Sequence, residues 1–83
     1  MNYILTQHAH NATQKREVSE AWLERTMVAP QRREPDPIDS ELEHRLAVIA
    51  EGDNRVLRVI VNTQAKLERV IAMYFDRKMR GRL

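Results

Sequence analysis

Apolar and polar residues alternate with the period of a β-strand in the last third of the chain. One alternating run spans Arg55–Asn62, a second spans residues 68–76, and a short polar stretch joins them. Two such runs with a short link between them are typical of antiparallel strands that pair directly. We therefore predict an antiparallel pair of strands in this part of the chain.

The same alternation assigns side chains to the two faces of the predicted sheet. The apolar residues that should share the core face are Leu57, Val59, Val61, Ile71, Met73 and Phe75. Arg58 of the first strand and Tyr74 and Asp76 of the second strand then emerge together on the opposite face. A small sheet that displays arginine and tyrosine and continues into a basic segment indicates a phosphate-bearing ligand, with RNA as the favoured partner.

Signals for helices come before these strands. A short apolar stretch at Tyr3–Leu5 can form a first strand, and Thr6 can then cap a helix over residues 7–16. Ser19 can cap a second helix over Glu20–Val28, which would end before a proline. Two consecutive helices between a first strand and the C-terminal strands are therefore predicted.

The middle of the chain allows more than one interpretation. Residues 32–38 contain two prolines, which are compatible with an extended loop or an edge strand but not with an interior strand. Residues 43–49 favour a strand followed by a turn at 51–54, although the same stretch also suits a helix capped by Ser40. The predicted order is β-α-α-β-β-β, an α+β fold with two N-terminal helices packed on a small antiparallel sheet. Trp22 of the second helix is expected to anchor against that sheet.

Length and composition limit the class of protein. Eighty-three residues make a single domain spanning 1–83, large enough for one sheet backed by helices. The chain contains no cysteine, which excludes disulfides, thiolate chemistry and cysteine-based zinc sites. The N-terminus has no basic leader followed by an apolar stretch, and no run approaches the length of a transmembrane helix. A cytoplasmic protein without a membrane partner is therefore expected.

Charge is distributed unevenly along the chain, although the formal net charge is only +2. Residues 77–83 form a basic tail that contains Arg77, Lys78, Arg80 and Arg82. Residues 34–43 contain five acids and no base, namely Glu34, Asp36, Asp39, Glu41 and Glu43. This asymmetry can draw a polyanion towards the basic end, and the alternative is that both ends are simply solvated.

The faces of the predicted strand at 43–49 bear on the candidate site. If Leu46 and Val48 belong to the core, Arg45 points to the same open face as the C-terminal arginine and tyrosine. His44 then lies at the margin of the core face. We therefore predict that Arg45 is one of the arginines available to a phosphate.

The open face has a functional and a structural interpretation. Arginines there could hold a phosphate and stabilise the charge that develops during phosphoryl transfer. Tyr74 could stack on a base or position an attacking 2′-hydroxyl. The structural alternative is that Arg58 and Asp76 form a cross-strand ion pair on a solvated sheet face.

The histidines offer two further possibilities. His8 lies in the first turn of the first predicted helix, where the helix dipole favours the neutral ring that a general base requires. The alternative is a helix-start histidine that only hydrogen-bonds a neighbour. His8 and His10 are two residues apart and diverge on a helix, so together with His44 they do not make a metal site. We predict neither a metal nor another cofactor.

Four short motifs occur in a recognisable order: Thr6-Gln-His8-Ala9, Arg16-Glu-Val-Ser19, the run from Asn54 to Asn62, and Tyr74-Phe-Asp-Arg77. Together they resemble a bacterial family of domains of unknown function that has a T-x-H-A start and a Y-F-D-R end. That family is similar to the small RelE-type and BrnT-type toxins of toxin–antitoxin systems, in which helices pack on an antiparallel sheet.

The resemblance implies a RelE-like fold and a metal-independent endoribonuclease toxin, encoded beside a small antitoxin protein that covers its active face. On the matching motif positions it implies catalytic roles for His8, Arg58, Tyr74 and Arg77. The other basic residues expected to contact RNA are Arg45, Arg55, Lys78, Arg80 and Arg82. One departure is Ala12, where many relatives of this type carry an arginine.

Two other classes of function stay open at the level of sequence. The first is a non-catalytic module that uses the same face to bind RNA or a partner protein, which Ala12 favours. The second is a structural protein whose exposed sheet edge pairs with another chain, so that a homo-oligomer is also compatible with the sequence.

Overall fold

A computed structural model describes residues 2–15 and 17–83 of the protein. The chain begins with strand β1 (Tyr3–Leu5) and helices α1 (Gln7–Gln14) and α2 (Glu20–Val28). The strands that follow are β2 (Arg32–Pro35), β3 (Leu42–Ile49), β4 (Arg55–Asn62) and β5 (Glu68–Phe75). Two short 3-10 helices, η1 (Ala50–Gly52) and η2 (Arg77–Met79), follow β3 and β5. The predicted α+β fold and its element order are confirmed, and residues 32–35 form the edge strand.

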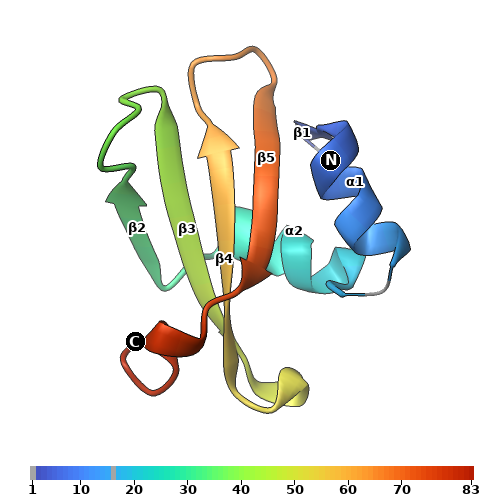
Figure 1. The fold of residues 1–83 in the computed structure, drawn as a ribbon, viewed down its shortest axis with the longest axis vertical. Coiled ribbons are helices and arrows are strands. Elements are labelled where there is room, and N and C mark those ends of the chain that lie inside the picture. The colour runs from blue at the N-terminus through green and yellow to red at the C-terminus, as the bar shows by residue number, and fades with distance from the viewer. Residues whose placement is uncertain (1, 16) are drawn as a thin grey trace.

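The five strands form one sheet in the order β1-β5-β4-β3-β2. The pairs β2–β3, β3–β4 and β4–β5 are antiparallel, whereas β1 pairs parallel to β5. The sheet is therefore mixed rather than purely antiparallel, because the two helices carry the chain away from β1 before the meander begins. Figure 1 shows α2 crossing behind the sheet and α1 lying beside β5.

Side-chain caps define where the two helices begin. The Thr6 hydroxyl accepts the backbone N–H of Ala9 at 3.3 Å and donates to the carbonyl of Ile71 in β5 at 3.0 Å. The Ser19 hydroxyl accepts the N–H of Trp22 at 3.1 Å. Both predicted caps are confirmed, and α1 ends at Gln14. The predicted end at Arg16 lies outside the residues that the structure describes.

The core lies between the helices and one face of the sheet. Its fully or almost fully buried members include Ala9, Leu23, Met27, Ala47, Ile49, Leu57, Val59, Val61, Val70 and Met73. Trp22 is half-buried and packs its ring edge-on to Phe75 with 5.9 Å between ring centres. Trp22 therefore contacts the sheet as predicted.

A β-bulge changes which residues of β5 face the helices. Ile60 pairs with Ala72, but the next residue of β4, Val61, pairs with Val70, so Ile71 is the extra residue. Val70 is fully buried in the core, while Ile71 is only half-buried. The expectation that Ile71 is a core residue is therefore wrong, because the bulge shifts the alternation of β5 by one position.

The connection between β3 and β4 forms where turn residues were predicted. After η1, Asp53 and Asn54 adopt left-handed backbone conformations with φ of 66° and 57°. Aspartate and asparagine tolerate this region better than other residues with a side chain. The turn lies at the same end of the sheet as η2 (Figure 1).

Within the described residues, no helix is long and apolar enough to cross a membrane.

Candidate functional site

Arg58 and Tyr74 lie opposite each other on neighbouring strands of the sheet. Their neighbours Leu57 and Val59 belong to the core beneath the helices, so Arg58 points to the other face. Tyr74 is the direct cross-strand partner of Arg58 and is 46% exposed. The prediction that these two side chains share the face away from the helices is confirmed.

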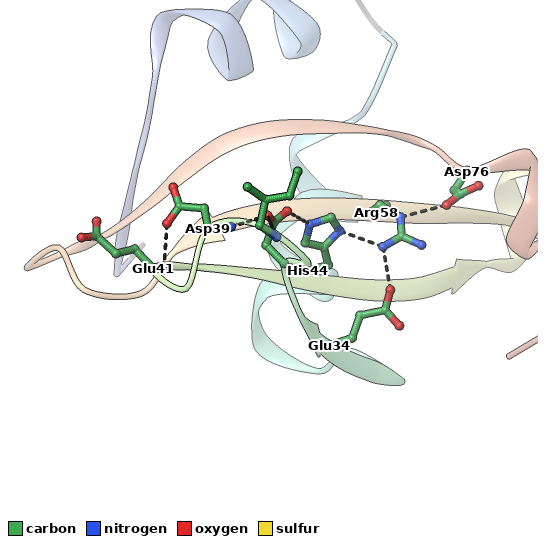
Figure 2. Close-up of polar contacts among 8 residues, drawn as sticks. Glu34, Asp39, Glu41, His44, Arg58 and Asp76 are labelled. Atoms are coloured by element: carbon green, nitrogen blue, oxygen red, sulfur yellow. Dashed lines mark hydrogen bonds and ion pairs between the residues drawn. The ribbon is translucent and has the colours of Figure 1, made fainter.

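Arg58 is almost fully buried on that face and is held by three partners. Its Nε donates to Asp76 Oδ2 at 2.8 Å, and its Nη1 donates to Glu34 Oε1 at 2.9 Å and to His44 Nδ1 at 2.8 Å. Figure 2 shows the guanidinium lying between these side chains. Its Nη2 makes no hydrogen bond to any residue of the described ranges, so one donor group is left for a ligand.

The partners keep Arg58 charged. Burial by itself would lower the pKa of its guanidinium, but the hydrogen bonds to Glu34 and Asp76 outweigh burial and raise it. The Arg58–Asp76 pair anticipated from the sequence is present. Glu34 and His44 were missed as partners, because their approach depends on how β2 and β3 pair in the sheet.

His44 has a defined donor and acceptor arrangement. A guanidinium only donates, so His44 Nδ1 must accept from Arg58, and Nε2 then donates to Asp36 Oδ1 at 2.7 Å. The backbone N–H of Asp39, the His44 ring and the N–H of Ile38 together lower the pKa of Asp36 to about 2. The hydrogen bonds therefore assign a neutral His44 ring with its proton on Nε2.

Arg45 lies on the helix side of the sheet, whereas the sequence analysis predicted that it shares the open face with Arg58 and Tyr74. It pairs with Val59, is 4% exposed and packs under α2, where its Nη1 donates to the carbonyl of Met27 at 3.3 Å. Ion pairs with Glu43 at 2.7 Å and Glu68 at 2.8 Å complete its surroundings. Burial would lower its pKa, but the hydrogen bonds to Glu68 and Glu43 raise it. Arg45 is therefore not available to a phosphate on the open face.

The error at Arg45 has a physical cause. Residues 46–49 are four consecutive apolar residues, so the sequence does not show which alternate pair faces the helices. Ala47 and Ile49 face the helices, whereas Leu46 pairs with Arg58 and is fully buried on the opposite side. His44 consequently lies on the face of Arg58, not at the margin of the core face.

His8 is not part of the Arg58 site. It lies in the first turn of α1 as predicted, is exposed, and lines a shallow pocket with Ala12 and Met73. Met73 belongs to the core face of β5, so this pocket is on the helix side of the sheet. The structure therefore does not bring His8 next to Arg58 and Tyr74.

A second feature, here called the arginine pocket, lies where β5 runs into η2. Its cavity of about 480 Å³ is lined by Arg55, Phe75, Asp76, Arg77 and Arg80. The Arg55 guanidinium lies 3.8 Å above the centre of the Phe75 ring, and its Nε donates to the Gly52 carbonyl at 2.8 Å. Arg80 Nη2 donates to the Asp53 carbonyl at 2.7 Å and contacts its carboxylate at 3.0 Å.

The arginine pocket gathers part of the basic set predicted from the sequence. Arg55 and Arg80, which were predicted to contact RNA, line it, whereas the exposed Lys78 and Arg82 do not. Arg77, to which the resemblance implied a catalytic role, also lines this pocket. Phe75 was predicted only as a core residue, and its contact with Arg55 was missed because it depends on the register between β4 and β5.

In residues 2–15 and 17–83, no group of three or more His, Cys, Asp or Glu side chains is placed to hold a metal ion.

Residues 5–75 match a family model described as a domain of unknown function, DUF4258. The chain belongs to this family. The match runs from Leu5, the last residue of β1, to Phe75, the last residue of β5, so it includes Arg58 and Tyr74 and ends one residue before Asp76. No curated protein and no solved structure shows a significant match to the chain.

Proposed function

We propose that this DUF4258 protein is a toxin of a toxin–antitoxin pair that cleaves RNA as a metal-independent endoribonuclease. The observation that carries the proposal is the pairing of Arg58 and Tyr74 on the sheet face away from both helices. The arrangement of two helices on one face of a largely antiparallel sheet also agrees with the resemblance to RelE-type and BrnT-type toxins. Such an enzyme would act on cytoplasmic RNA.

In the proposed reaction, the 2′-oxygen of a ribose forms a bond to the adjacent phosphorus while the bond from phosphorus to the 5′-oxygen breaks. Arg58 Nη2, which is free of hydrogen bonds within the described residues, binds a phosphate oxygen and stabilises the added charge. Tyr74 positions the 2′-hydroxyl. The products are a 2′,3′-cyclic phosphate and a 5′-hydroxyl.

The proton of the 2′-hydroxyl requires an acceptor on the same face. His44 takes the role that the sequence assigned to His8, because His44 Nδ1 already lies 2.8 Å from Arg58 Nη1. When Arg58 turns to the phosphate, Nδ1 becomes free to accept the proton, and the carboxylate of Asp36 stabilises the resulting imidazolium. The leaving 5′-oxygen takes its proton from water.

The proposal also includes a partner. A small antitoxin encoded nearby would cover the Arg58 and Tyr74 face and block RNA access. The half-exposed Tyr74 ring and the 93% exposed side chain of Ile38 offer apolar surface to a protein partner beside the charged network.

Induced expression tests the proposal. We expect growth to stop and cellular RNA to accumulate fragments that end in 2′,3′-cyclic phosphate. Tyr74→Phe removes only the hydroxyl of a half-exposed residue and should lower the cleavage rate at least about tenfold without unfolding the domain. Tyr3→Phe is the matched control, because the Tyr3 hydroxyl contacts Glu24 on the helix side. Normal growth and intact RNA at high levels of soluble, folded protein would contradict the proposal.

A second candidate function is a non-catalytic module that binds RNA or a protein. The enclosure of Arg58 by Glu34, His44 and Asp76 favours it, because these contacts must loosen before the guanidinium can fully engage a phosphate. Ala12 favours it too, because the resemblance implies an arginine at this position. This module would show salt-sensitive association with its ligand but no RNA fragments.

A further inference from the structure

Arg55 and Phe75 of the arginine pocket lie on the helix side of the sheet, whereas Tyr74 lies on the other face. We infer that the arginine pocket binds one phosphate-bearing nucleotide of single-stranded RNA, an inference that rests on the proposed function for the identity of the polymer. The nucleotide would be a neighbour of the one cleaved, held by Arg55 and Arg77 at the end of β5.

Arg55 is fixed before any ligand arrives. Its guanidinium is stacked on Phe75 at 3.8 Å, and its Nε is held by the Gly52 carbonyl at 2.8 Å. Both terminal nitrogens remain without a hydrogen-bond partner in the described part of the chain. A guanidinium that offers its two terminal nitrogens matches the two oxygens of a phosphate, and its fixed position reduces the entropy lost on binding.

The pocket keeps a positive charge despite its one acid. Asp76 is already engaged, since its Oδ2 accepts from Arg58 and its Oδ1 accepts the backbone N–H of Lys78. Arg77 forms no ion pair with any described residue. Arg80 pairs with Asp53, whose carboxylate is largely exposed, and such a surface contact is weak enough to yield to a phosphate.

The size and the walls of the pocket favour a nucleotide over a bare phosphate. A cavity of about 480 Å³ falls in the range of small-ligand sites, far more space than a phosphate fills. The outer plane of the Arg55 guanidinium, backed by Phe75, is a surface on which a base can stack.

Asp76 connects the pocket to the open face. Its carboxylate holds Arg58, and the chain continues from it directly into Arg77. An RNA strand that has one phosphate at Arg58 can therefore reach the pocket with an adjacent nucleotide. This continuity points to a polymer and not to a free nucleotide as the ligand.

Binding of a fluorescently labelled single-stranded RNA to the purified protein tests the inference. Arg55→Gln and Arg77→Gln should each weaken binding about tenfold or more, because each removes charge-assisted hydrogen bonds to phosphate. Arg69→Gln removes the same charge from an exposed site at the opposite end of β5 and should change the affinity less than about twofold. Arg55 also anchors the turn, so circular dichroism must show that its variant is folded, and the exposed Arg77 provides the independent variant.

Competition identifies the ligand class. Adenosine monophosphate should displace the RNA from the wild-type protein, inorganic phosphate should do so only at higher concentration, and adenosine should not. Equal loss of RNA affinity in Arg55→Gln, Arg77→Gln and Arg69→Gln would overturn the inference, as would no loss in any of them.

Cleavage assays separate this inference from the proposed function. RNA and adenosine monophosphate binding that depends on Arg55 and Arg77, without any cleavage, would support the pocket and contradict the endoribonuclease. Cleavage with an unchanged KM in Arg55→Gln and Arg77→Gln would support the endoribonuclease and overturn the pocket.

Discussion

A buried guanidinium determines the chemistry of the open face at the scale of single residues. Arg58 is 9% exposed, and folding must therefore compensate for the loss of water around its charge. Asp76 and Glu34 supply two carboxylates, and His44 supplies a neutral acceptor. The same contacts that stabilise the buried arginine in the fold also orient it, so the structural role of Arg58 and its proposed functional role overlap.

Removal of Arg58 should therefore destabilise the domain. Arg58→Met keeps the apolar part of the side chain but leaves Asp76 and Glu34 without their cation, and we expect a loss of about 3 kcal/mol. Urea unfolding of the variant against the wild type measures this loss. Arg33→Met is the control at an exposed position of β2 and should change stability by less than about 0.5 kcal/mol. An Arg58→Met variant as stable as the control would show that the network adds nothing to the fold.

Asp36 should make the stability of the domain depend on acid pH. Its pKa is lowered from an ordinary value of 3.8 to about 2 in the fold, so its carboxylate stabilises the native state above pH 3.8. That contribution is lost as the pH falls through about 2. Asp36→Asn should therefore lose less stability between pH 4 and pH 2 than the wild type does, as measured by urea midpoints.

Glu51→Gln is the control variant for the effect of Asp36→Asn on the dependence of stability on pH. The ion pair with Arg25 lowers the pKa of Glu51 to about 2, so Glu51 contributes acid-dependent stability in the same range. Glu51→Gln should flatten the profile by removing that contribution while it preserves the one from Asp36. A profile for Asp36→Asn that coincides with the wild type would contradict the assignment of the Asp36 contacts.

At the scale of elements, local sequence patterns were sufficient to predict a helix start or a strand face where nearby residues determine it. Thr6 and Ser19 predicted the helix starts, and the side-chain alternation of a strand predicted the face of Arg58 in β4. Local sequence patterns did not predict the features that depend only on how neighbouring strands pair. The bulge at Ile71 and the faces of residues 46–49 depend on neighbouring strands, so the sequence alone misplaced Ile71 and Arg45.

The residues of the candidate site also divide into those that local patterns predict and those whose contacts depend on strand pairing. Arg58, Tyr74 and Asp76 could be grouped from alternation in two adjacent strands, because a short link brings those strands together. Glu34 reaches Arg58 only through the β2–β3 register, and no local pattern encodes a contact across 24 residues. Sequence reasoning therefore found the centre of the network but not the side chains around it.

Thr6 connects two elements, and its loss should affect both. Thr6→Val keeps the shape of the side chain but removes the hydroxyl that caps α1 and donates to the Ile71 carbonyl in β5. We expect a loss of about 1–2 kcal/mol in urea unfolding. Thr6→Ser retains the hydroxyl and should lie much closer to the wild type. Equal stability of the valine and serine variants would show that the first Thr of the T-x-H-A motif is not needed as a cap.

At the scale of the whole molecule, pairing inside the fold changes the charge pattern seen in the sequence. Two of the five acids in residues 34–43 form ion pairs with arginines within the domain, Glu34 with Arg58 and Glu43 with Arg45, and Asp36 accepts a hydrogen bond from the neutral His44 ring. The acidic segment is therefore partly neutralised. The basic end keeps more of its charge, since Arg77, Lys78 and Arg82 form no ion pairs with described residues.

This residual charge at the basic end predicts how the proposed RNA binding should respond to salt. Each phosphate that an arginine neutralises on a single strand contributes about −0.7 to the slope of log K against log salt concentration. Arg77→Gln should therefore make the measured slope less steep by about 0.7, in a titration from low to physiological salt. Tyr74→Phe removes no charge, so it should leave the slope unchanged even if it weakens binding. The loss of a direct contact between Arg77 and a phosphate must lower the number of counterions released on binding, and so must change the slope. The same slope in Arg77→Gln and in the wild type would therefore mean that other residues contact the phosphates.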